Sequence, residues 1–83
     1  MKKIYNSLEK LSSVLLELRQ KCPWDKKQTI ESLRHLTIEE VYELSEAILL
    51  NDYDLIKEEL GDILLHILFY SLISSENNKF SLV

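Results

Sequence analysis

Hydrophobic residues recur along the chain at alternating steps of four and three, which is the spacing of one face of an α-helix. The first such stretch ends at Pro23, because proline cannot continue a helix and disfavours helical backbone in the residue before it. A capping box of Asn6 and Glu9 would start this helix at Ser7. Its apolar stripe consists of Ile4, Leu8, Leu11, Leu15, Leu18 and Cys22.

A second helix is expected after a polar loop over residues 23–28. Thr29 is suited to cap a short turn that follows the loop. Thr37 with Glu40 matches a capping box, so the helix is expected to open there and to run to about Leu50. The stripe expected to be buried on this helix consists of Val41, Leu44 and Ile48.

The third helix is expected to start near Asp54, after a turn rich in residues that hydrogen-bond their own backbone. Apolar residues cover its other faces as well from Ile63 onward, and a helix that is apolar all round must be buried all round. Two other helices cannot enclose it, so we expect it to pack at a subunit interface. Its stripe consists of Ile56, Leu60, Ile63 and Ile67.

The composition supports a single all-α domain over residues 1–83, because 46% of the residues are hydrophobic and only one glycine and one proline interrupt them. Cys22 is alone, which excludes an internal disulfide, and Gly61 is alone, which excludes a glycine-rich phosphate loop. The net charge of −4 argues against a nucleic-acid partner. Without a membrane span or secretory signal, we expect a cytoplasmic protein with no membrane partner.

Acidic residues stand out by their spacing, E-E-x-x-E on the second helix and E-x-x-D on the third. Side chains three positions apart are neighbours on a helix, and both sets lie about 10 Å from the intervening turn at ~1.5 Å per residue. An antiparallel hairpin would therefore bring to one level Glu40, Glu43, Glu59 and Asp62. Four like charges need a cation, and oxygen ligands favour Mg²⁺ or Mn²⁺, which points to phosphoryl chemistry.

Other interpretations of these residues stay open. Acids three apart also occur on solvated helix faces, and Glu40 could serve only as a capping-box partner. A ferritin-like di-iron site is not supported, because neither histidine follows a glutamate by three positions. His66 lies one turn after Asp62 and could touch the site, or it could be a core or interface residue.

Three segments of the chain resemble the MazG family of nucleoside triphosphate pyrophosphohydrolases. They are CPWDKKQT at 22–29, ESLRHLTIEEVYELSEAI at 31–48 and EELGDILLHILFYS at 58–71. The resemblance covers residues 15–83, and its first segment is similar to the N-terminal domain of tandem family proteins. Family domains usually continue into a fourth helix, so we expect this chain to be either a fragment truncated at its C-terminus or a naturally short form of the domain.

The resemblance implies an all-α bundle completed by oligomerisation into a homodimer or tetramer. It also implies Mg²⁺-dependent hydrolysis of nucleoside triphosphates to nucleoside monophosphate and pyrophosphate, as housekeeping of the nucleotide pool. Glu39 would be an outer acid or would orient water, and Glu39 or Glu43 could accept the proton of the attacking water. The implied metal ligands are Glu40, Glu43, Glu59 and Asp62.

Basic and aromatic residues complete the expected site. The phosphates would be contacted by Arg19, Lys26, Lys27 and Lys57, although each could be a solvated surface residue. Trp24 could stack on the base or cap the core. Two other classes of function also stay open. One is a catalytically silent dimerisation or regulatory module that still binds metal, and the other is a coiled-coil-like interaction domain.

Overall fold

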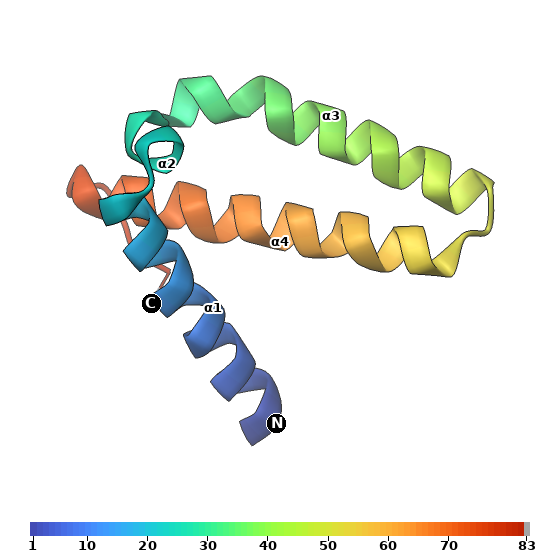
Figure 1. The fold of residues 1–83 in the computed structure, drawn as a ribbon, viewed down its shortest axis with the longest axis horizontal. Coiled ribbons are helices and arrows are strands. Elements are labelled where there is room, and N and C mark those ends of the chain that lie inside the picture. The colour runs from blue at the N-terminus through green and yellow to red at the C-terminus, as the bar shows by residue number, and fades with distance from the viewer. Residues whose placement is uncertain (83) are drawn as a thin grey trace.

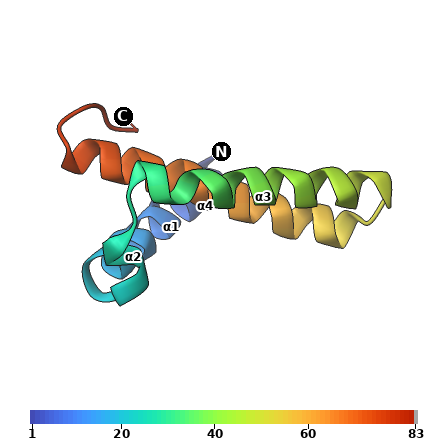
Figure 2. The ribbon, with the colours of Figure 1, turned by 90° about the horizontal axis from the view of Figure 1, so that it is seen from above.

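The computed structural model describes residues 1–82, and these form four helices (Figure 1). The helices are α1 (Lys2–Lys21), α2 (Pro23–Lys27), α3 (Ile30–Leu49) and α4 (Tyr53–Glu76). Helices α3 and α4 run antiparallel and side by side, whereas α1 extends away from them and α2 lies at the N-terminal end of α3 (Figures 1 and 2). The expected all-α fold, a helical hairpin plus an N-terminal helix, is confirmed.

Local capping decides where α3 begins. The Thr29 hydroxyl accepts a hydrogen bond from the Ser32 N–H, and the Ser32 hydroxyl accepts one from the Thr29 N–H. This reciprocal capping box starts the helix well before Thr37. The predicted capping box of Thr37 and Glu40 is therefore wrong. Thr37 lies inside α3, where its hydroxyl donates to the Leu33 carbonyl at 3.1 Å.

The N-terminal part also differs from the expectation. Helix α1 begins at Lys2, so the predicted start at Ser7 with a capping box of Asn6 and Glu9 is wrong. The expected loop after α1 contains the short helix α2, with Pro23 in its first turn. Proline is tolerated there because the first helical N–H groups have no intrahelical partner in any case.

The turn between α3 and α4 is closed by polar residues, as expected. The Asp52 carboxylate accepts a hydrogen bond from the Leu55 N–H at 3.2 Å and caps α4. Asn51 has a left-handed φ of 54°, a conformation that asparagine tolerates better than most residues. The turn returns the chain so that α4 pairs with α3 along its length, which fixes which side chains of the two helices face each other.

The hydrophobic core lies where α1, α3 and α4 meet, at the end of the hairpin remote from the turn. Leu33 is fully enclosed there. Leu11 on α1 packs against this core, and Leu8 and Leu11 border an open groove with Leu64 of α4. The core consists of Leu15, Leu33, Leu68, Phe69 and Ile73.

The apolar stripes expected to be buried lie largely outside this core. Val41 and Ile48 on α3 are 51% and 54% exposed, and Leu60 and Ile67 on α4 are 53% and 50% exposed. The expectation that these stripes pack inside the hairpin is wrong, because the inner face near the turn carries carboxylates and Ala47 instead. Among residues 1–82, no helix is long and apolar enough to cross a membrane.

Arg19 joins α1 to α2 and to the end of α4. Its Nε and Nη2 donate to the Glu76 carboxylate, with an ion pair of 2.9 Å. We call these contacts the Arg19 latch. Its Nη1 donates, at 2.6, 3.2 and 2.8 Å, to the main-chain carbonyls of Asp25, Lys26 and Gln28.

Candidate functional site

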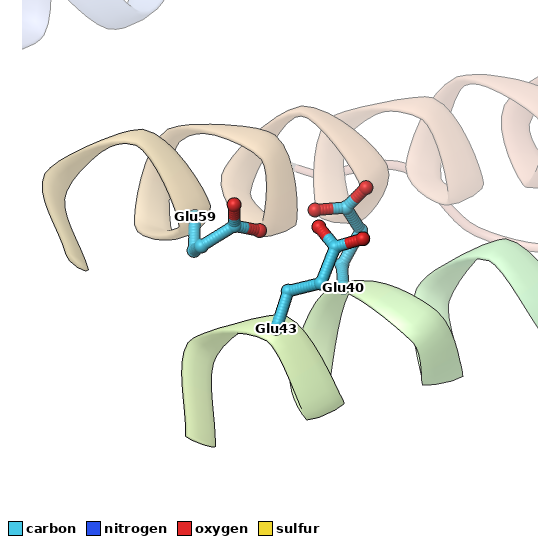
Figure 3. Close-up of side chains that lie close together, drawn as sticks. All are labelled: Glu40, Glu43 and Glu59. Atoms are coloured by element: carbon cyan, nitrogen blue, oxygen red, sulfur yellow. The ribbon is translucent and has the colours of Figure 1, made fainter. Parts of the chain in front are cut away.

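Three glutamates meet between the two helices of the hairpin. Glu40 and Glu43 extend from α3 and Glu59 extends from α4, and their carboxylates turn toward one another (Figure 3). One carboxylate oxygen from each lies within 4.8 Å of the other two. We call these three residues the glutamate cluster. The expected convergence of acids from the two helices is therefore observed for these three.

The cluster is partly withdrawn from solvent. Glu59 is only 6% exposed and Glu40 is half-buried, whereas Glu43 is exposed. The Oε2 atoms of Glu40 and Glu59 are buried and have no hydrogen-bond partner among the described residues. A buried carboxylate oxygen without a partner is costly, and paired charge or a metal is the usual remedy. The donor set, made only of carboxylate oxygens, fits a hard divalent cation.

Repulsion between the carboxylates raises the pKa values of the cluster. The interaction with Glu40 and burial together raise the pKa of Glu59, and the interaction with Glu59 raises the pKa of Glu43. Glu59 acts to lower the pKa of Glu40, but burial and the charges of Glu43 and Asp62 outweigh this and leave it raised. The three groups therefore resist being ionised together unless positive charge is supplied.

A pH dependence of stability follows from these shifts. A carboxyl group whose pKa is raised above 4.5 by folding binds more protons in the folded chain, so its contribution to stability falls as the pH rises above that value. We expect the metal-free wild type to lose stability relative to a Glu59→Gln variant between about pH 4.5 and pH 7. Urea unfolding with a chelator present measures this difference.

The comparison with the variant also cancels the opposite effect of His66. Burial lowers the pKa of His66, so its contribution to stability rises with pH in both proteins. A difference in unfolding free energy that stays constant across this pH range would contradict the prediction.

The other predicted acids lie beside the cluster. Asp62 is exposed and lies one turn after Glu59 on α4. It is not one of the three converging groups, but its negative charge acts to raise the pKa of all three. Glu39 is exposed on α3 and lies about 100° round the helix from Glu40.

The predicted nucleotide contacts lie apart from the cluster. Trp24, Lys26 and Lys27 belong to α2, at the N-terminal end of α3 (Figure 2). Lys57 is exposed on α4 and lies about 200° round the helix from Glu59. Arg19 uses Nε and Nη2 in its latch, and its Nη1 donates to main-chain carbonyls. Among the described residues, no hydrogen bond or ion pair joins these five side chains to the cluster.

Another polar group lies one helical turn from the cluster and was not expected as a unit. The Thr37 hydroxyl contacts the Nδ1 atom of His66 at 2.8 Å and the hydroxyl of Tyr70. His66 and Tyr70 lie seven and eleven positions after Glu59, so all three share one face of α4. That helical spacing is the sequence signal that could have identified the group.

Comparison with known proteins gives consistent matches. The model of the MazG nucleotide pyrophosphohydrolase domain matches residues 28–83. The nucleoside triphosphate pyrophosphohydrolase/pyrophosphatase MazG of Thermotoga maritima is 47% identical over 76 residues, which cover 89% of this chain and 30% of that protein. The nucleoside triphosphate pyrophosphohydrolase of Escherichia coli K12 is 37% identical over 78 residues, which cover 90% of this chain and 30% of that protein. This chain therefore spans less than a third of the length of these relatives.

Proposed function

The chain belongs to the family of MazG nucleotide pyrophosphohydrolase domains, and from this premise we propose that it hydrolyses nucleoside triphosphates. The products would be a nucleoside monophosphate and pyrophosphate, and the setting would be upkeep of the cytoplasmic nucleotide pool. The names of two relatives support the reaction. The observation that carries it is the glutamate cluster, in which Glu40 and Glu59 each hold a buried oxygen without a partner.

We propose Mg²⁺, with Mn²⁺ as a substitute, as the cation of this site. Its ligands would be Glu40, Glu43, Glu59 and Asp62. Carboxylate oxygens on two facing helices support this choice, because Mg²⁺ binds through a few carboxylates and completes its shell with water and substrate phosphates. When bound, the ion would neutralise the triphosphate and make its phosphorus more susceptible to attack.

The buried and the exposed side chains of the cluster would have different roles in the reaction. Glu40 and Glu59 are held between the helices and would hold the cation that binds the triphosphate. Glu43 is exposed and has a raised pKa, which suits a group that accepts the proton of the attacking water. Glu39 is an alternative acceptor, or it orients that water. The new bond joins the water oxygen to phosphorus, and pyrophosphate leaves with the electrons of the broken bond.

We propose that nucleotide contacts come from α2 and from Lys57. The exposure of Lys26, Lys27 and Lys57 leaves their ammonium groups available to phosphates, and Trp24 is 53% exposed and available to stack on a base. Arg19 is the weakest of the five candidates, because its guanidinium is already engaged. Since α2 lies apart from the cluster within one chain, its contacts would reach a cluster on a second copy.

Two observations support assembly of at least two copies. The Cα radius of gyration is 13.9 Å, whereas a compact chain of this length would have a value of about 12 Å. The second observation is a shallow apolar groove along the outer face of α3, which we call the α3 groove. It is lined by Val41, Leu44, Ser45, Ile48 and Leu49. Exposed apolar surface of this kind marks interaction sites in soluble proteins.

Replacing Ile48 with aspartate should dissociate the assembly. A carboxylate in the α3 groove would have to be buried without a partner in the interface. We expect the wild type to sediment as a dimer or tetramer and the variant as a monomer, measured by analytical ultracentrifugation. The control is Ser13→Asp, which places the same charge on an exposed face of α1. A monomeric wild type would contradict the proposal.

The decisive experiment for the reaction is pyrophosphate release from a mixture of nucleoside triphosphates, with and without Mg²⁺. We expect release with Mg²⁺ and none with a chelator. Thermal unfolding with and without Mg²⁺ is measured in parallel, because a ligand that binds only the folded chain raises its stability. Stabilisation without pyrophosphate release would favour a silent module that binds metal. Neither effect would favour a plain interaction domain.

A further inference from the structure

The hydrogen-bond inventory of Thr37 defines the state of its neighbours. A threonine hydroxyl has one hydrogen to donate and can accept two hydrogen bonds. The hydrogen goes to the Leu33 carbonyl at 3.1 Å, because a carbonyl oxygen can only accept. The Thr37 oxygen must then be the acceptor in its two remaining hydrogen bonds. The donors are His66 Nδ1–H, at 2.8 Å, and the Tyr70 hydroxyl.

If Nδ1 of His66 carries a proton, the state of Nε2 depends on whether the imidazole is neutral. Partial burial lowers the pKa of His66 and thereby favours the neutral imidazole, whereas the charge of Asp62 acts to raise that pKa. A neutral imidazole carries a single proton, so a proton on Nδ1 leaves Nε2 as a hydrogen-bond acceptor. Aqueous histidine has no such constraint, and the exposed His35 represents that case within the same chain.

His66 lies four positions after Asp62 on α4, so the two side chains are neighbours on one face of that helix. Side chains of a helix lean toward its N-terminus, which for His66 is the direction of Asp62 and Glu59. Thr37 lies three positions before Glu40 on α3, so its contact with His66 is about 5 Å, or one helical turn, from Glu40 along the helix. Since Nδ1 points to Thr37, the opposite edge of the ring points away from α3.

We infer that Thr37 and Tyr70 hold His66 as the tautomer protonated on Nδ1, and that Nε2 then accepts a hydrogen bond from a water molecule beside Asp62. His66 is thus a positioning residue that orients water without carrying charge into a cation site. The tautomer stands independently of the reaction, whereas the use of Nε2 rests on the proposed function.

Long-range proton–nitrogen correlation NMR on the metal-free wild type tests the tautomer directly. We expect His66 to show a protonated Nδ1 and a bare Nε2, whereas His35 shows the mixture typical of an exposed histidine. Thr37→Val removes the hydroxyl and should abolish the preference, and Thr37→Ser keeps the hydroxyl and should retain it. A protonated Nε2 in the wild type would overturn the inference, whether or not the variants fold.

Two replacements of His66 separate positioning from mere packing. The amide of glutamine reaches the place of Nε2, whereas the amide of asparagine reaches that of Nδ1. We expect His66→Asn to weaken Mn²⁺ binding, measured by calorimetry, by about tenfold, the range in which partners of metal ligands act. His66→Gln should retain most of the affinity.

The reverse order, with asparagine the better replacement, would show that only the contact with Thr37 matters and would overturn the role of Nε2. Equal affinities of the wild type and both variants would do the same. Absence of pyrophosphate release with the expected tautomer and Mn²⁺ affinities would contradict the proposed reaction alone.

Discussion

Replacing Glu59 with glutamine should reduce kcat/KM for pyrophosphate release by about a hundredfold or more, because losing even an outer partner of a metal ligand typically costs ten- to a hundredfold. Glutamine keeps the shape of the side chain and removes its charge. Glu59 is the most buried member of the glutamate cluster, so no water can readily replace its oxygens. Pyrophosphate release under saturating Mg²⁺ measures the effect.

The same substitution should stabilise the metal-free chain, because it removes one of three charges that repel one another. Loss of activity with a gain in stability cannot be explained by misfolding. Glu58→Gln is the matched control, since Glu58 is the preceding residue on α4 and is exposed, and it should change neither property. A Glu59→Gln variant with wild-type activity would contradict the proposed site.

Replacing Leu33 with alanine should remove a large share of the stability of the chain. Leu33 has no exposed surface and lies in the core between α1, α3 and α4. Truncating a fully buried leucine typically costs about 2–5 kcal/mol, which is a large share of the roughly 5–15 kcal/mol that stabilises an ordinary domain.

Urea unfolding gives the change in free energy of this variant. The control is Tyr42→Ala, at a position on the same helix that is 72% exposed and outside the α3 groove, where we expect little change. Similar losses at both positions would show that the core is not where the structure places it.

The hairpin and its glutamates could be predicted because both depend on simple helical geometry. The turn after α3 is marked by residues that hydrogen-bond locally, and the acids lie at matched distances from it. Glu40, Glu43 and Glu59 therefore had to meet once the helices paired. The same reasoning placed Asp62 with them, but Asp62 is exposed and is not one of the three converging groups. Position along a helix was readable, but small rotations of one helix against the other were not.

The start of α3 could not be read correctly because two capping signals competed. Thr37 and Glu40 match the consensus better than Thr29 and Ser32, yet Thr29 and Ser32 form the box. A helix begun earlier simply continues through Thr37, whose hydroxyl can donate to the preceding turn. Glu40 lies instead on the face of α3 that meets α4, in the glutamate cluster.

The prediction that the apolar stripes are buried within the hairpin was wrong for a different reason. Periodicity identifies a hydrophobic face but does not say whether that face meets the same chain or another one. Here the inner face near the turn is occupied by acids, so Val41 and Ile48 face outward. The assumption that every apolar stripe is buried within its own chain was the step that failed.

The Arg19 latch has a consequence for the order in which the chain folds. Its contact with Glu76 joins residues 57 positions apart, whereas α3 and α4 pair across a short turn. Closing the larger loop costs more chain entropy, so we expect the hairpin to form first and the latch to close last. Contacts that close last and lie near solvent are also the first to open. The latch can then open while Leu15 keeps α1 in the core and the glutamates stay assembled.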